Sequence, residues 1–283
     1  MEVHMSKKKQ DGVYFFWSTS IIICMLVALF VLGFASCAKG TPAASPSASP
    51  SASPNTEASP SASPEGSTAP VTSPTSSSME TALAETTDMG QEYVDKFIFL
   101  GDSTTNGLAY YDVVNDNQVW TPASGTLTLS LWSTATIVYR DDDSEISIVD
   151  AVTKKQPEYI LITLGVNGVS FMDEEYFIKE YTKLVQAIKE ASPNTKIILN
   201  SIYPVTAAYS EKDNGITNEK IDNANTWVER VANSLSVKYL DSESVIKDTN
   251  GAMPDKISND GEIHFNEDGY KLVINYLRTH GYQ

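Results

Sequence analysis

Short apolar runs alternate with longer amphipathic stretches along the chain from residue 93 to the C-terminus. A run of about four to eight residues that is rich in Val, Ile, Leu and aromatic side chains is typical of a buried strand. The pattern predicts strands at residues 96–100, 134–139, 146–149, 159–164, 196–202 and 237–240.

Three longer stretches carry apolar residues on one face at the spacing of an α-helix. The first covers residues 174–191 and is followed by Pro193, which cannot continue a helix. The second covers residues 218–235. The third covers residues 266–280, where Asn266 is suited to the N-cap position. We therefore predict a helix in each stretch.

The order of these elements predicts the fold class. Strands that alternate with helices favour a parallel sheet, and the strand at 159–164 is apolar without interruption, as expected when both sheet faces are covered. We predict one α/β domain at residues 93–283, a three-layer α/β/α sandwich with a mostly parallel central sheet. In such folds, ligands bind beyond the carboxyl ends of the strands.

The N-terminal 37 residues have the features of an export signal. Lys7, Lys8 and Lys9 precede a nearly continuous apolar stretch at residues 13–34, and small residues then lead to Cys37. This end resembles a bacterial lipobox, which makes Cys37 the expected lipidation site. The apolar stretch is also long enough to cross a bilayer core of about 30 Å as an uncleaved anchor. Both readings predict a membrane-attached domain on the cell surface.

Residues 38–92 are predicted to be a disordered linker. From residue 41 to residue 78 the chain consists almost entirely of Pro, Ser, Ala and Thr, so it can bury too little apolar surface to fold. The chain has two cysteines, Cys24 and Cys37, and both lie in the signal region. We expect no disulfide and no cysteine-bound metal in the exported part.

Charge and histidine content narrow the chemistry further. The formal net charge of −16 argues against binding to nucleic acid. Of the three histidines, His4 lies in the signal region and His280 lies near the C-terminus, which leaves His264 as the one well-placed base. We expect no metal site and no cofactor.

Three polar segments follow predicted strands or precede the last predicted helix. Gly101-Asp102-Ser103 ends the first strand, Gly165-Val166-Asn167-Gly168 follows the strand at 159–164, and Asp260 to Asn266 precedes the final helix. Because the carboxyl ends of parallel strands share one edge of the sheet, we expect Ser103, Asn167 and His264 to lie on the same rim.

These segments, in this order, resemble the motifs of the SGNH/GDSL hydrolase family, whose fold is flavodoxin-like. The resemblance covers residues 96–283. It implies that Ser103 is the nucleophile and contributes its own N–H to an oxyanion hole, that the Asn167 side chain is a second donor, and that His264 is the base. The family also uses a glycine N–H, for which Gly125 is the best candidate here.

Two positions depart from the family pattern. The aspartate that usually follows the asparagine is Gly168, and the acid expected three residues before the histidine is replaced by Gly261. Asp260 reaches the imidazole only if the loop bulges. Otherwise Glu262 or a backbone carbonyl orients the ring, or the site works as a Ser–His dyad.

The sequence thus predicts a surface-tethered serine esterase that removes short acyl groups, acetyl above all, from a carbohydrate or another small ester. Two alternatives stay open: a non-catalytic carbohydrate-binding relative, and a lipase or thioesterase acting on longer acyl chains. Two aromatic groups also have two readings, because Trp120 and Tyr110-Tyr111 either line a sugar-binding cleft or pack against a loop.

Overall fold

The computed structural model describes residues 81–283. The predicted signal region with Cys37 and Cys24, and the predicted linker up to residue 80, lie outside the described residues. Among residues 81–283, no helix has both the length and the apolar character needed to cross a membrane.

The centre of the domain is a five-stranded sheet in which every neighbouring pair is parallel. Parallel neighbours require crossover connections, and these run through the helices. All five strands therefore end at the same edge of the sheet. In spatial order they are β2 (Val119–Trp120), β1 (Phe97–Gly101), β5 (Tyr159–Thr163), β6 (Lys196–Asn200) and β7 (Lys238–Leu240).

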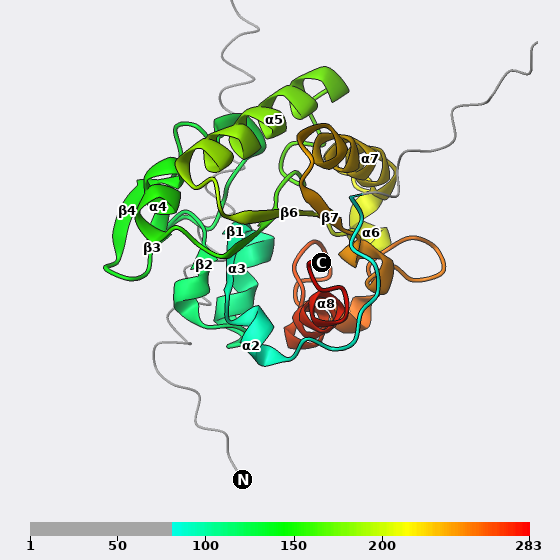
Figure 1. Ribbon diagram of the computed structural model, residues 1–283. Coiled ribbons are helices and arrows are strands. Elements are labelled where there is room, and N and C mark those ends of the chain that lie inside the picture. The colour runs from blue at the N-terminus through cyan, green and yellow to red at the C-terminus, as the bar shows by residue number, and fades with distance from the viewer. Residues whose placement is uncertain (1–80) are drawn as a thin grey trace, which may run out of the picture. The chain divides into compact units, whose positions relative to one another are not determined.

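Helices cover both faces of this sheet (Figure 1). Each helical layer closes its own hydrophobic cluster against the strands, so the predicted three-layer α/β/α sandwich is confirmed. One face carries α4 (Ile148–Lys155), α5 (Glu174–Ala191) and α7 (Asn218–Leu235); the other carries α2 (Gln91–Val94), α3 (Ser103–Tyr110) and α8 (Glu267–Thr279). A short helix, α6 (Ala207–Ser210), follows β6.

Two of the predicted strands do not belong to the main sheet. They form a separate antiparallel hairpin of β3 (Thr136–Tyr139) and β4 (Ser144–Ser147). The predicted strand at 146–149 is wrong in its second half, since Ser147 caps α4 by accepting a hydrogen bond from the Asp150 N–H at 3.0 Å. Ile148 is buried as the first residue of that helix.

Helix α3, which begins at Ser103, was not predicted, because its sequence is rich in poor helix formers, with two threonines, an asparagine and a glycine. The helix forms because of one local interaction and one contact with another helix. The Asp102 side chain caps its first turn, and Gly107 lets it approach α8, since a Cβ there would lie 2.1 Å from the Tyr270 hydroxyl oxygen.

The aromatic residues beyond the nucleophile are mainly structural. Trp120 is 1% exposed and its ring lies 5.8 Å from that of Tyr139, so it packs in the core and does not line a cleft. Tyr110 and Tyr111 contact each other edge to face at 4.9 Å, and Tyr111 also packs near Tyr270.

The segment at residues 81–90, which lies within the predicted linker, packs against the folded domain. Ala82 forms a parallel bridge with Tyr239 of β7, and the Leu83 N–H donates to the Tyr239 carbonyl at 2.8 Å. Further along, the Asp88 carboxylate accepts two hydrogen bonds from Arg278 of α8. The predicted boundary at residue 93 is thus too late, because these backbone bonds extend the sheet edge.

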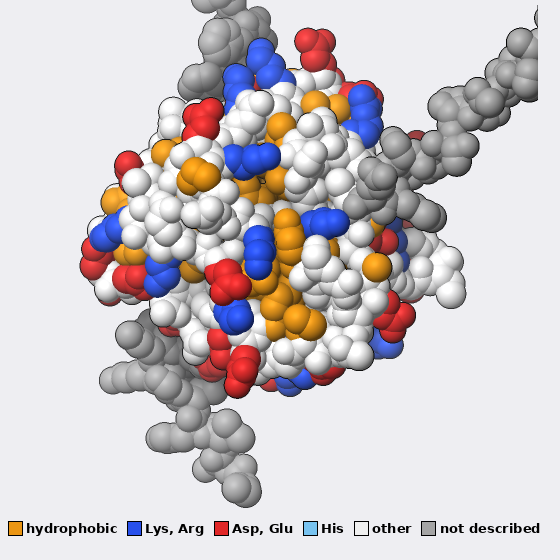
Figure 2. All heavy atoms as spheres, in the orientation of Figure 1, with side chains coloured by type: hydrophobic (Ala, Val, Ile, Leu, Met, Phe, Trp, Pro, Cys, Tyr) orange, Lys and Arg blue, Asp and Glu red, His pale blue; other side chains and the backbone are white. Residues whose placement is uncertain are grey.

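Figure 2 shows one face of the molecule in the orientation of Figure 1. A band of hydrophobic side chains crosses its middle, and Lys and Arg side chains are interspersed there with Asp and Glu.

We predict that a chain shortened to residue 93 is less stable than one beginning at residue 81. The shorter chain loses the backbone bonds to Tyr239 and the ion pair to Arg278, which hold β7 and the end of α8 together. Thermal unfolding followed by circular dichroism should show a midpoint several degrees lower. Equal midpoints would mean that residues 81–92 contribute nothing to the domain.

Candidate active site

Ser103 lies where β1 ends and α3 begins. The strand terminates at Gly101, and a Cβ on that residue would lie 2.0 Å from the Thr105 Oγ1 and 2.6 Å from the Thr163 carbonyl oxygen. Only glycine therefore fits where the turn passes β5. Ser103 is the first residue of α3, so its N–H has no acceptor within the helix and sits at the positive end of the helix dipole.

His264 joins Ser103 to a carboxylate. Its Nε2 lies 2.9 Å from the Ser103 Oγ, and its Nδ1 lies 2.5 Å from the Asp260 Oδ2. An ionised carboxylate only accepts hydrogen bonds, so the ring proton is on Nδ1 and Nε2 is free to accept from the serine hydroxyl. The structure thus brings the three predicted catalytic residues into one hydrogen-bonded chain across 161 positions of sequence.

The loop around Gly261 explains how Asp260 reaches the imidazole from four positions earlier. Gly261 has φ +73°, a left-handed conformation that accommodates the additional residue. The turned backbone directs three N–H groups at the Asp260 Oδ1: those of Glu262 at 2.8 Å, Ile263 at 3.1 Å and His264 at 3.2 Å. One carboxylate oxygen therefore holds the loop while the other orients the ring.

Glu262 does not take part in this arrangement. Its carboxylate pairs with the Lys212 ammonium at 2.5 Å. Of the groups that could orient His264, the Asp260 carboxylate is the one in contact with Nδ1.

Electrostatics keep Asp260 ionised. Burial acts to raise its pKa, but the hydrogen bond and charge of His264 and the N–H groups of the loop outweigh burial and lower the pKa to about 2. The carboxylate therefore stays charged across the whole range in which the protein is expected to work.

Asn167 lies on the same rim, in the loop that leaves β5. Its Nδ2 donates to the Asp102 Oδ2 at 3.3 Å and to the Leu127 carbonyl at 3.2 Å. Because Asp102 precedes Ser103, this contact places the amide beside the serine. The next position, where the family has aspartate, is crowded: a Cβ on Gly168 would lie 2.8 Å from the Met172 Sδ.

Gly125, the candidate glycine donor, lies in a turn. Its N–H donates to the Pro122 carbonyl at 2.8 Å, and its φ of +74° closes a turn. The glycine is explained by the turn, and its N–H is already used. The oxyanion-donor function assigned to Gly125 from the sequence therefore stays a prediction.

A family model for the GDSL-like lipase/acylhydrolase family matches residues 99–272, which include Ser103, His264 and Asp260. The protein belongs to this family. It is accordingly a hydrolase of ester bonds, with the α/β architecture described above. No curated protein shows significant similarity in sequence.

One solved structure with a similar fold is a protein from Streptococcus pneumonia provisionally named as a platelet activating factor, with 19% identity, 65% of this chain and 82% of that chain covered, and a TM-score of 0.50. A GDSL-like lipase from Bacteroides thetaiotaomicron has 17% identity, 67% and 88% coverage, and a TM-score of 0.45. An acetylxylan esterase from Geobacillus stearothermophilus has 17% identity, 66% and 94% coverage, and a TM-score of 0.42.

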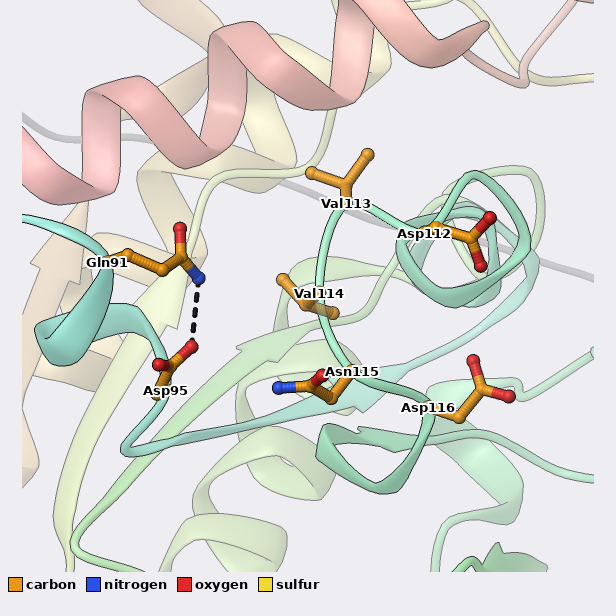
Figure 3. A pocket seen from close by; sticks show the side chains of 7 residues that line it. All are labelled: Gln91, Asp95, Asp112, Val113, Val114, Asn115 and Asp116. Atoms are coloured by element: carbon orange, nitrogen blue, oxygen red, sulfur yellow. Dashed lines mark hydrogen bonds between the residues drawn. The ribbon is translucent and has the colours of Figure 1, made fainter.

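An open hollow elsewhere on this GDSL-family domain is unrelated to the hydrogen-bonded chain (Figure 3). It lies between α2 and the segment after α3, and it contains neither a histidine nor a nucleophile. Among residues 81–283, no three His, Cys, Asp or Glu side chains are grouped to hold a metal ion. The hollow is lined by Gln91, Asp95, Asp112, Val113, Val114, Asn115 and Asp116.

Asp102 is the second carboxylate near the nucleophile, and its surroundings differ from those of Asp260. It is 0% exposed. Burial raises its pKa to about 6, although the Thr104 hydroxyl and N–H and the charge of His264 act in the opposite direction. The site therefore contains two different carboxylates. Asp260, which contacts His264, ionises readily, whereas ionisation of the buried Asp102, next to Ser103, costs free energy.

The Gly261 turn supplies the first test of this site. Gly261→Ala should lower kcat several-fold and destabilise the fold by about 1 kcal/mol, because the left-handed conformation strains any residue with a Cβ. Nothing lies within 4 Å of that Cβ, so strain acts without a clash. Steady-state kinetics and denaturant unfolding measure the two effects.

Gly251→Ala is a matched control, since Gly251 also has a left-handed φ, +77°, and open space around its Cβ. It should destabilise the protein equally and leave kcat unchanged. An equal loss of activity in both variants would mean that the Asp260 loop has no special part in the site.

The pKa of Asp102 predicts how stability depends on pH. Its pKa in the folded state, about 6, lies above the ordinary value of 3.8, so between these values the native state binds more protons than the unfolded state. The contribution of Asp102 to the unfolding free energy is therefore largest at low pH and is lost as the pH rises from about 4 to about 6. Asp102→Asn removes this dependence.

The unfolding free energy of Asp102→Asn relative to the unsubstituted protein should therefore increase by up to about 3 kcal/mol from pH 4 to pH 7. Urea unfolding at several pH values measures this slope, and any constant offset from lost hydrogen bonds does not affect it. A flat difference for Asp102→Asn would contradict the burial of an ionised group.

Proposed function

We propose that the chain is an extracytoplasmic serine esterase that removes short acyl groups, acetyl above all, from a carbohydrate or another small ester. The observation that carries the proposal is the hydrogen-bonded chain Ser103–His264–Asp260 at the start of α3. Its order and its proton positions are those required for a general base to activate a serine hydroxyl.

In the acylation step, the Ser103 Oγ attacks the ester carbonyl carbon while the His264 Nε2 takes the hydroxyl proton. The developing oxyanion is met by the Ser103 N–H and by the Asn167 side-chain amide. The C–O bond to the alcohol then breaks, and the departing oxygen receives the proton from His264. The products of this step are the free alcohol and an acyl-Ser103 ester.

In the deacylation step, His264 takes a proton from water as the water oxygen attacks the acyl carbonyl. The bond to the Ser103 Oγ breaks, and the same proton returns to that oxygen, which releases the carboxylic acid. The Asp260 charge stabilises the imidazolium that forms in both steps.

The proposed preference for a short acyl group is tested by the comparison of ester chain lengths described below. The preference for a surface location is supported by the lysines, the apolar stretch and Cys37 of the N-terminal region.

Two alternatives are distinguished by simple measurements. A lipase or thioesterase would hydrolyse p-nitrophenyl octanoate at least as fast as p-nitrophenyl acetate, whereas a short-chain esterase loses rate steeply with chain length. A non-catalytic carbohydrate-binding relative was suggested by the glycine at position 261, but the contact of Asp260 with His264 removes the reason for it.

We predict that a fluorophosphonate probe labels the protein covalently and that Ser103→Ala abolishes the labelling. The reason is that only a serine activated by a base attacks such a probe at a useful rate. Ser133→Ala is the control, because Ser133 is an exposed serine outside the chain of hydrogen bonds. Labelling of folded Ser103→Ala to the same extent would contradict the proposal.

A further inference from the structure

The Asp102 carboxylate has an unusual set of partners for a fully buried charge. Its Oδ1 accepts from the Thr104 N–H at 3.0 Å and from the Thr104 hydroxyl at 2.7 Å, while its Oδ2 accepts from the Asn167 Nδ2 at 3.3 Å. Within the described part of the chain, no ion pair with Lys or Arg compensates the charge. Burial of a carboxylate without a cation is costly.

Capping of α3 does not require this charge. Asn and Ser cap helices about as well as Asp, and both would accept the bond from the Thr104 N–H. The need for a carboxylate must therefore come from the second oxygen, which faces Asn167.

A carboxylate and an amide at position 102 differ in what they present to Asn167. If asparagine kept its carbonyl oxygen on Thr104, its NH₂ group would face the NH₂ group of Asn167, and two donors repel each other. The Asn167 amide would then turn over and present its carbonyl oxygen. With aspartate, both oxygens are acceptors, so one amide orientation is stabilised: Nδ2 toward Asp102 and the serine.

The other N–H of Asn167 has a partner that is easily exchanged. It donates to the Leu127 carbonyl at 3.2 Å in a part-buried setting. An oxyanion is a better acceptor than a neutral carbonyl, so this N–H can pass to the reacting oxygen while the bond to Asp102 keeps the amide from rotating.

We propose that Asp102 is a positioning residue, which orients the Asn167 amide so that it donates to the oxyanion. This rests on the proposed esterase function. A preorganised donor requires no reorientation when the negative charge develops, and this saving is the main source of oxyanion stabilisation. The cost of the buried charge is thus linked to the reaction and not to the fold.

The test uses the full-length chain and p-nitrophenyl acetate. Asp102→Asn should lower kcat by about 10² to 10³, the loss typical of one oxyanion donor, with KM changed by less than about threefold. Asp102→Ser, which also retains a cap, should lose as much. The matched control is Asp173→Asn at the N-cap of α5, which should keep kcat.

A second measurement separates positioning from a merely structural effect. The double variant Asp102→Asn/Asn167→Ala should be no slower than Asn167→Ala alone, because the partner whose orientation is lost is already absent. Multiplied losses, or kcat of Asp102→Asn within about threefold of the unsubstituted protein, would overturn the proposal.

The exchanged pair Asp102→Asn/Asn167→Asp gives a further signature. It restores a donor–acceptor contact with the direction reversed, so its melting temperature should exceed that of Asp102→Asn. Activity should stay lost, since a carboxylate then faces the oxyanion. Recovery of activity together with stability would show that Asp102 serves only the fold.

Failure of this inference is distinguishable from failure of the esterase function. If Ser103 labels with the fluorophosphonate and the ester is hydrolysed, but Asp102→Asn is unimpaired, only the positioning function is wrong. If the unsubstituted protein neither labels nor hydrolyses the ester, the proposed function itself is wrong.

Discussion

Parallel pairing of β1 with β5 is the constraint on which the rest of the site depends. The register sets Gly101 opposite Thr163, so both strands end at one edge and their loops leave side by side. This edge places Ser103 and Asn167 next to each other although they are 64 positions apart in sequence. Because helices cover both faces of the sheet, a substrate can approach at the edge formed by the carboxyl ends of the strands.

Two aspartates lie near the nucleophile, and their different surroundings shift their pKa values in opposite directions. Asp260 lies in a partly exposed loop that directs three N–H groups at it, and its pKa is lowered to about 2. Asp102 is buried with neutral donors only, and its pKa is raised to about 6. The surroundings of Asp260 stabilise its negative charge, whereas burial destabilises the charge of Asp102. The first orients the base, and in our proposal the second orients the oxyanion donor.

The elements that the sequence predicted well are those with a strong period. The bounds of α5 and α7 agree with the predicted ranges, because an apolar face repeated over 18 residues is unambiguous. Helix α3 was missed since its residues have low helix propensity, and β2 was missed since it has only two residues. Both elements flank the nucleophile, where function and tertiary contacts outweigh local preference.

By itself, the sequence determined the fold class, the family resemblance and the three polar segments that contain Ser103, Asn167 and His264. These depend on local patterns of side chains, which can be read along the chain. Only the tertiary structure decided which carboxylate contacts His264 and that the Gly125 N–H is occupied by a turn. It also decided that residues 81–90 belong to the domain. The physical reason is that a single left-handed residue, Gly261, or an edge-strand bond redirects the backbone in a way that no local pattern of polarity records.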